Sequence, residues 1–119
     1  MNWYIAHVIM YFKFEDGNQN KYPIFENYIL VSGATKREAF EKAKAKSLQE
    51  EGTNTGSIDI DDRPALLTYA GIRKIVECED SDLTPVDGTE VSYSKLEVKT
   101  NEELQKLIKG EPVNIEYVE

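Results

Sequence analysis

The sequence predicts a single α+β domain in which an antiparallel sheet of four or five strands carries two helices on one face. Three observations lead to this two-layer sandwich. The chain has 119 residues, which suits one hydrophobic core. Runs of aromatic and branched residues come in pairs joined by turn residues, and two helix-start signals interrupt them. The resulting order over residues 1–119 is strand, strand, helix, strand, strand, helix, strand.

The first strand is expected over residues 3–14, which are rich in aromatic and branched side chains. Both of its faces are largely apolar, so a central position in the sheet is expected. Polar residues 15–21, with the turn dipeptide Asp16-Gly17, lead to a second strand over 24–31. The two strands most simply form a hairpin.

The first helix is expected from Thr35 to about Glu51. Thr35 and Glu38 form a capping box, in which each side chain bonds a free backbone N–H at the helix start. Gly52 is the expected stop. One face of this helix should be buried and the other should meet water. The buried set is Ala39, Phe40, Ala43 and Leu48, and the exposed set is Lys42, Lys44, Lys46 and Gln49.

Residues 53–64 are predicted to form a polar loop, in which Pro64 excludes a regular central strand. A third strand follows over 66–78, where Gly71 marks a bulge or a close backbone approach. After a charged loop over 79–88, residues 89–98 are predicted to return as an antiparallel fourth strand.

A second capping box, Thr100 with Glu103, starts the second helix. Gly110 and Pro112 end it. Its apolar residues are Leu104, Leu107 and Ile108. Residues 113–118 alternate apolar and polar side chains and predict a short edge strand.

The charge balance argues against nucleic acid as a partner. Fourteen basic residues against 22 acidic ones give a net charge of −8, and the basic residues are scattered. A phosphate backbone would be repelled by such a field. An acidic domain could instead bind a basic protein, but the spread of the charges favours a simple role in solubility.

A cytoplasmic location is expected. No run approaches the roughly 20 apolar residues of a membrane helix, and residues 1–4 lack the basic start of a signal peptide. The single cysteine, Cys78, has no internal disulfide partner, which fits a reducing compartment. Neither a membrane nor a cofactor is predicted.

Candidate metal and catalytic residues are few. The run Asp59-Ile60-Asp61-Asp62 could offer carboxylates to Ca²⁺ or Mg²⁺, but Pro64 and Ala70 stand where an EF-hand needs glycine and glutamate. His7, the only histidine, is expected to be a half-buried packing residue. Neighbouring anions should raise the pKa of Cys78, so it is not expected to be a nucleophile. We therefore predict no metal and no catalytic group.

The third strand carries the strongest candidate for a ligand site. Strict alternation would place Tyr69, Gly71 and Arg73 on one face, and an arginine there can clamp a carboxylate or phosphate through two hydrogen bonds. The simpler interpretation is a bulged strand whose arginine pairs with a neighbouring glutamate.

The aromatic residues of the first half exceed what two helices can cover. An uncovered apolar sheet face tends to become an interface with a partner. The residues concerned are Trp3, Tyr4, Tyr11, Phe12, Phe14, Tyr22, Phe25 and Tyr28.

Three segments together resemble the bacterial family of domains of unknown function numbered 4288. They are Trp3-Tyr4-x-Ala6, the strand Tyr69-x-Gly71-Ile72-Arg73-Lys74-Ile75, and Asp87-Gly88-Thr89-Glu90-Val91-x-Tyr93. The resemblance covers roughly residues 3–98, including the helix with Glu38-Ala39 and Lys42-Ala43. It implies no established activity or ligand.

The leading hypothesis is a non-enzymatic module, immunity-like or regulatory, that binds a protein partner or forms a homodimer. Its candidate binding residues are Arg73, Tyr69, Gly71, His7 and Trp3. The alternative is a small-ligand or catalytic pocket on the sheet around Arg73, Tyr69 and His7, which requires these side chains to share one face. A third possibility, binding of a basic protein by acidic loops, predicts association that weakens steeply with salt.

Overall fold

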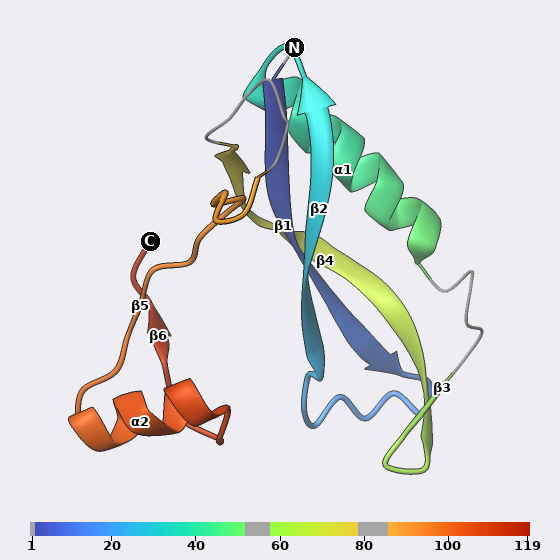
Figure 1. The fold of residues 1–119 in the computed structure, drawn as a ribbon. Helices are drawn as coiled ribbons and strands as arrows, with labels where there is room; N and C mark the ends of the chain where they lie inside the picture. Colours follow the sequence, from blue (N-terminus) through green and yellow to red (C-terminus); the bar gives the residue numbers. More distant parts are fainter. Residues whose placement is uncertain (1, 52–57, 79–85) are drawn as a thin grey trace.

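The computed structural model describes residues 2–51, 58–78 and 86–119. These residues form two helices and six strands (Figure 1). In chain order they are β1 (Asn2–Phe14), β2 (Ile24–Gly33), α1 (Lys36–Glu50), β3 (Ile58–Ile60), β4 (Arg63–Glu77), β5 (Leu96–Glu97), α2 (Asn101–Lys109) and β6 (Glu116–Tyr117). The predicted α+β class is confirmed.

The main sheet is antiparallel, with the order β2-β1-β4-β3. The predicted hairpin of β1 with β2 is confirmed, with Tyr4 opposite Val31 and Tyr11 opposite Ile24. β1 also pairs with β4, so it occupies the predicted central position. Because β1 has a neighbour on each side, its position is fixed by backbone hydrogen bonds along both edges. β2 forms an outer edge of the sheet.

The hydrophobic core lies between this sheet and α1. Alternate side chains of β1 point to this side and are almost fully buried, and Ala39 and Ala43 of α1 have no exposed area. Small alanine side chains let the helix approach the sheet closely. The β1 residues concerned are Tyr4, Ala6, Val8 and Met10.

The predicted buried face of α1 is partly wrong. Leu48 is 44% exposed, whereas Ser47 is buried beside Ala39 and Ala43. Positions 39, 43 and 47 are spaced four apart and lie along one stripe of the helix. The Ser47 hydroxyl donates to the carbonyl of Ala43 at 2.8 Å, so its polar group is satisfied inside the core.

The start of α1 follows the predicted capping box. Thr35 Oγ accepts a hydrogen bond from the Glu38 N–H at 3.1 Å. The Glu38 carboxylate reaches back to the Ala34 N–H, also at 3.1 Å. The helix ends at Glu50, and the predicted stop at Gly52 lies outside the described residues.

The predicted loop over 53–64 contains a hairpin that the sequence analysis missed. β3 pairs with the start of β4, and Asp61 and Asp62 connect them with positive φ angles of 53° and 61°. Two such residues form the type I′ geometry that matches strand twist. Pro64 lies inside β4, an inner strand of the sheet, so the prediction that it excludes a regular central strand is wrong. It stands at the second strand position, opposite Asp59, where a missing N–H is tolerated.

β4 carries the predicted irregularity around Gly71. Its register with β1 shifts between His7 and Val8 and between Ile9 and Met10. The shifts leave Arg73 and Ala70 without a directly opposed residue in β1, which is the pattern of a bulge. The bulge prediction is therefore confirmed. A Cβ at Gly71 would meet nothing within 4 Å, so no other described part of the backbone approaches this glycine closely.

The predicted fourth strand over 89–98 is wrong for most of its length. Only Leu96–Glu97 is a strand, and it pairs with β6 in a separate two-stranded ladder. Residues 89–95 follow an irregular path. The final strand over 113–118 is confirmed in part, as β6.

The two caps of α2 are as predicted, with Thr100 at its start and Gly110, at φ 73°, at its end. The prediction that both helices cover one sheet face is wrong, because α1 alone packs on the main sheet among the described elements. Leu104 and Ile108 of α2 are 42% and 67% exposed. α2 lies with β5 and β6, away from α1 (Figure 1).

Candidate functional site

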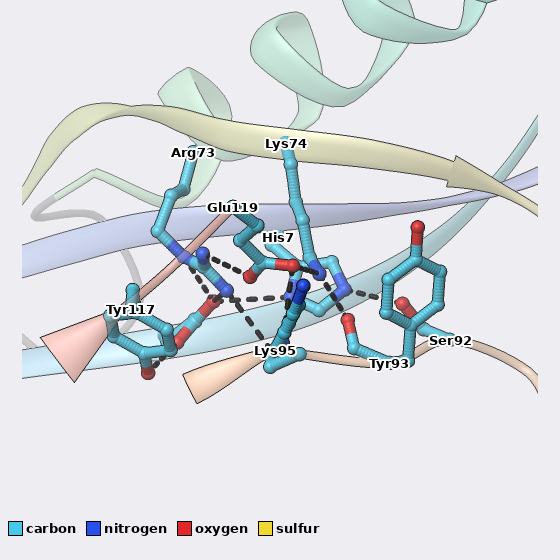
Figure 2. Close-up of polar contacts among 10 residues, drawn as sticks. His7, Arg73, Lys74, Ser92, Tyr93, Lys95, Tyr117 and Glu119 are labelled. Atoms are coloured by element: carbon cyan, nitrogen blue, oxygen red, sulfur yellow. Dashed lines mark hydrogen bonds and ion pairs between the residues drawn. The ribbon is translucent and has the colours of Figure 1, made fainter. Parts of the chain in front are cut away.

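The face of the sheet opposite α1, which we call the open face, carries a cluster of polar side chains. Glu26 comes from β2. His7 comes from β1, and Arg73 and Lys74 come from β4 (Figure 2). The bulge explains the last pair, since in a bulge two successive residues stand opposite one residue of the neighbouring strand. Lys74 is paired with His7, and Arg73 is the extra residue beside it.

Glu26 is the centre of this cluster. Its Oε2 accepts from Arg73 Nε at 2.8 Å and from His7 Nδ1 at 3.1 Å, and its Oε1 accepts from the Tyr117 hydroxyl at 2.9 Å. Burial works to raise the Glu26 pKa, but these hydrogen bonds outweigh it, and the net pKa is lowered. Glu26 is therefore a carboxylate with three donors.

Residues 113–119 reach this cluster from the far end of the chain. Glu119 Oε1 lies 2.5 Å from Arg73 Nη1, and its Oε2 lies 2.5 Å from Lys74 Nζ. Hydrogen bonds from Lys74 and Arg73 lower the Glu119 pKa to about 2. The Tyr117 ring packs on the guanidinium of Arg73, 4.0 Å from ring centroid to Cζ. The two cations of β4 thus hold this segment on the open face.

His7 is more buried than predicted, with 1% of its surface exposed. Its ring packs on Tyr28, with centroids 4.4 Å apart, and its Nε2 lies 2.5 Å from Ser92 Oγ. In the neutral tautomer that donates from Nδ1 to Glu26, Nε2 accepts from the serine hydroxyl. His7 therefore fixes the irregular segment around Ser92 to the sheet.

The order Ser92–His7–Glu26 matches the connectivity of a nucleophile, a base and an orienting carboxylate. The charge distribution argues against that use. Arg73 Nη2 lies 2.7 Å from the same Glu26 oxygen that His7 contacts. A guanidinium there already neutralises the carboxylate that would stabilise an imidazolium ion. We interpret the three residues as a structural hydrogen-bond chain.

The five predicted binding residues are not all brought together. Arg73 and His7 share the open face and are linked through Glu26. Tyr69 pairs with Met10 and packs against the α1-side core, so its predicted place on one face with Arg73 is wrong. The two register shifts break the strict alternation on which that prediction rested. Burial and the nearby Glu41 raise the Tyr69 pKa.

The depressions on the surface agree with this separation. Tyr69 lines one of about 410 Å³ with Tyr22 and Ile24, and His7 lines another of about 240 Å³ with Tyr28 and Ser92. Arg73 lines a third, of about 520 Å³, beside Phe40 of α1. Arg73, Tyr69 and His7 therefore line three separate depressions.

The predicted surplus of aromatic residues is present on β2 and its approach. Trp3 is half-buried at the start of β1, and Tyr4, Phe12 and Phe14 are buried. Tyr22, Phe25 and Tyr28 are 61%, 53% and 61% exposed. Ile24 and Leu30 of β2 are also more than half exposed. An apolar surface therefore follows the edge of the sheet.

The other candidate residues have simpler surroundings. Cys78 is buried, and burial together with Glu77 raises its pKa, while the neighbours Glu79 and Asp80 lie outside the described residues. Asp61 pairs with Lys21. No group of three metal-ligating side chains occurs in the described parts of the chain. In the same residues no helix is long and apolar enough to cross a membrane.

Glu26, Ser92, Tyr117 and Glu119 were missed as site residues. Glu26 did carry a signal, because it is the one charged residue in a mostly apolar strand. The predicted pairing of Arg73 with a glutamate pointed in the same direction. For Tyr117 and Glu119 there was no comparable signal, since their contacts with β4 span more than 40 residues of sequence.

Together these features define a small α+β domain with one apolar face closed by a helix and one face carrying a half-buried ion-pair cluster. A comparison with protein families matched residues 3–94 to the domain of unknown function DUF4288. The chain therefore belongs to this family, as the resemblance implied. No curated protein and no solved structure matched the chain.

Proposed function

We propose that this domain is a non-enzymatic protein-interaction module and that β2 is its binding element. One observation carries the proposal. β2 is an edge strand with ten residues, its exposed side chains are apolar, and its single charged residue is turned inward to Arg73.

An edge strand presents free backbone N–H and C=O groups that can pair with another strand. Proteins usually prevent this with lysine, proline or charged side chains on the edge. β2 contains neither lysine nor proline, and the Glu26 side chain is only 15% exposed. Addition of a further strand would satisfy the free groups and cover Phe25, Tyr28 and Leu30.

The partner that fits this edge best is a second copy of the chain. Two β2 strands pairing antiparallel about a twofold axis would be self-complementary, and no exposed charge on either strand would oppose the contact. The main sheet would then continue from one protomer into the other. The alternative partner is a different protein that adds its own strand to β2.

The polar groups support a non-enzymatic role. His7 and Arg73 are hydrogen-bonded within the domain, which leaves them as structural groups rather than free acids or bases. A regulatory or immunity-type protein needs only a stable surface, which the edge and face of β2 provide. The unpaired Cys78 fits a reducing compartment, so the cytoplasm is the proposed location.

Sedimentation velocity over a roughly hundredfold concentration range tests this proposal. The unmodified protein should shift from monomer to dimer as concentration rises. Leu30→Lys places a charge on the 51% exposed edge position. It should weaken the dimer at least about tenfold, or ~1.4 kcal/mol, because each copy would then carry a charge on the edge strand that has to pair.

The matched control is Ile108→Lys on α2, where the original side chain is 67% exposed and far from β2 in the sequence. It should leave association unchanged. Loss of the dimer in this variant alone would move the interface to α2. A protein that stays monomeric at every concentration, and whose capture of another protein is insensitive to Leu30→Lys, would contradict the proposal.

A further inference from the structure

The contact of Glu119 with β4 resembles a ligand in a binding site more than a piece of core packing. Figure 2 shows the carboxylate between the side chains of Arg73 and Lys74. Each carboxylate oxygen lies 2.5 Å from one of the two cations, and the Lys95 N–H adds a third donor at 3.2 Å. The Glu119 side chain is 16% exposed.

Two residues before it, Tyr117 fills an adjoining position. Its ring lies over the guanidinium of Arg73, and its hydroxyl donates to Glu26. Arg73 thus contacts both an aromatic ring and a carboxylate of the same segment. The recognised pattern is an aromatic residue, any residue, and then an acidic residue.

The backbone of this segment also pairs with β5, where Leu96 lies opposite Tyr117, and the Val118 N–H donates to the Lys95 carbonyl at 3.0 Å. Val118 is 41% exposed, and Glu116 also faces solvent. Little apolar surface is therefore buried, and the side chains that join the segment to β4 are the Tyr117 ring and the Glu119 carboxylate. Contacts of this kind break more readily than core packing, because water stabilises each charged group once it has separated from its partner.

The family match covers the two cations of β4 but not the segment that contacts them. Residues 3–94 match the family, so Glu26, Arg73 and Lys74 lie inside the matched region, whereas Tyr117 and Glu119 lie outside it. Among the described residues, Glu119 is the only carboxylate within salt-bridge distance of Lys74. The bulge places two neighbouring cations on one face of a chain whose net charge is −8. Bulges often re-aim side chains at functional positions.

We propose that Arg73, Lys74 and Glu26 form a peptide-binding site of the family domain, specific for an acidic segment of the pattern Tyr-x-Glu. In this chain Tyr117 and Glu119 occupy the site in cis. A competing acidic peptide binds when these residues release it. Glu26 lies on β2, but its carboxylate is turned inward to Arg73, so the proposal does not depend on self-association through the outer edge of β2.

Fluorescence anisotropy with a labelled peptide of sequence VNIEYVE, which copies residues 113–119, tests the proposal. Glu119→Gln removes the internal carboxylate charge while keeping the side-chain size. This variant should bind the peptide at least about tenfold more tightly than the unmodified protein. The double variant Tyr117→Ala with Glu119→Gln should bind it at least as tightly, because both internal contacts are then removed.

Three controls define the site. Glu116→Gln makes the same charge change in the same segment, away from β4, and should leave affinity unchanged. The peptide VNIEYVQ should bind weakly to every variant, because it lacks the terminal carboxylate side chain. Adding Lys74→Met to Glu119→Gln should remove the gain.

Nuclear magnetic resonance of the Glu119→Gln variant gives an independent readout. In this variant the Arg73 Nε–H signal should shift saturably with VNIEYVE and not with VNIEYVQ. Equal peptide affinity in the unmodified protein and both released variants, or an Arg73 signal that fails to respond, would overturn the proposal. Retention of these responses in the Leu30→Lys background would separate this site from the β2 surface.

Discussion

The two faces of the sheet are stabilised in different ways. On the α1 side, Ala6, Val8, Ala39 and Ala43 have no exposed area, and the contact is made by close-fitting apolar side chains. On the open face, Glu26 and Arg73 connect the strands to the C-terminal segment through ion pairs and hydrogen bonds. Close packing depends on shape and is insensitive to pH, whereas the ionic contacts depend on protonation and on salt.

The larger buried hydrophobic cluster lies on the α1 side, and apolar burial is the dominant favourable term in folding. The two proposals above assign binding to the open face and to the edge of β2. The following changes test whether the two faces can be perturbed independently.

The largest effect is expected from Met10→Ala on the α1 side. Met10 is 2% exposed and belongs to the core cluster with Val8 and Ile75. Removing its side chain leaves a cavity, so the free energy of unfolding should fall by about 2–5 kcal/mol. Urea denaturation measures this. Ile108→Ala, at a 67% exposed position, should change it by less than about 0.5 kcal/mol.

A smaller loss of stability is expected from Gly33→Ala at the junction of β2 and α1. A Cβ there would lie 2.9 Å from the Thr35 carbonyl oxygen and 3.0 Å from the Ala39 nitrogen. Because both atoms are backbone, the helix start must shift, at a cost of about 1–3 kcal/mol. Gly71→Ala is the matched control, since a Cβ at Gly71 meets nothing within 4 Å. Equal losses in urea denaturation would show that crowding is not the cause.

The α1 side of the sheet also illustrates what the sequence could predict. The strand pattern of β1 and the capping box at Thr35 are local signals, and they placed the central strand, the hairpin and α1 correctly. The burial of Ser47 in place of Leu48 was not predictable from apolar pattern alone. A close helix–sheet approach favours small side chains, and Ser47 satisfies its hydroxyl within the helix.

The errors in the second half share a physical cause. The prediction for residues 89–98 used local strand propensity, but strand formation also needs a free neighbour with matching register. That segment instead contacts His7 through Ser92, and Lys74 through the ring and carbonyl of Tyr93. The site residues were missed for the same reason, because their positions depend on tertiary contacts. Arg73 was identified from its own strand, whereas its partners Tyr117 and Glu119 are set by tertiary contacts.

On the open face, Arg73→Met should loosen residues 113–119 without unfolding the core. The change leaves Glu26 and Glu119 without their shared guanidinium, which costs about 1–3 kcal/mol for the groups left unpaired. Amide hydrogen exchange should speed up in residues 113–119, while exchange in β1 changes little. Equal acceleration in both would mean that the two faces form a single cooperative unit.

Acid should release the same segment in the unmodified protein. The Glu119 pKa is lowered from 4.5 to about 2 by Lys74 and Arg73. A lowered pKa in the bound state means that the contact contributes above pH 4.5 and is lost as the pH falls through about 2. Resonances of Tyr117 should report this release. Asp16, with its pKa also lowered to about 2, titrates in the same range, but it acts on the distant 15–21 turn through Arg63.

Glu119→Gln supplies the control for this titration. Its Tyr117 resonances should lose the pH dependence between about 4.5 and 2, because the group responsible has been removed. Persistence of the same transition in Glu119→Gln would assign it to another carboxyl group, with Glu26 as the nearest candidate.

The smallest effect is expected at Ser92, where the prediction is an absence of reaction. A nucleophilic serine must transfer its proton to a histidine whose positive charge is then stabilised by a carboxylate. Here Glu26 Oε2 is 2.7 Å from Arg73 Nη2, so the imidazolium would form beside an existing cation. A fluorophosphonate probe should therefore leave Ser92 unlabelled in the unmodified protein, as read by mass spectrometry. Labelling that requires His7 would show that this hydrogen-bond chain is catalytic. Labelling that appears only in Arg73→Met would show that the guanidinium suppresses a reactive serine. The ion pair between Arg73 and Glu26 would then be the feature that keeps the Ser92–His7–Glu26 chain unreactive.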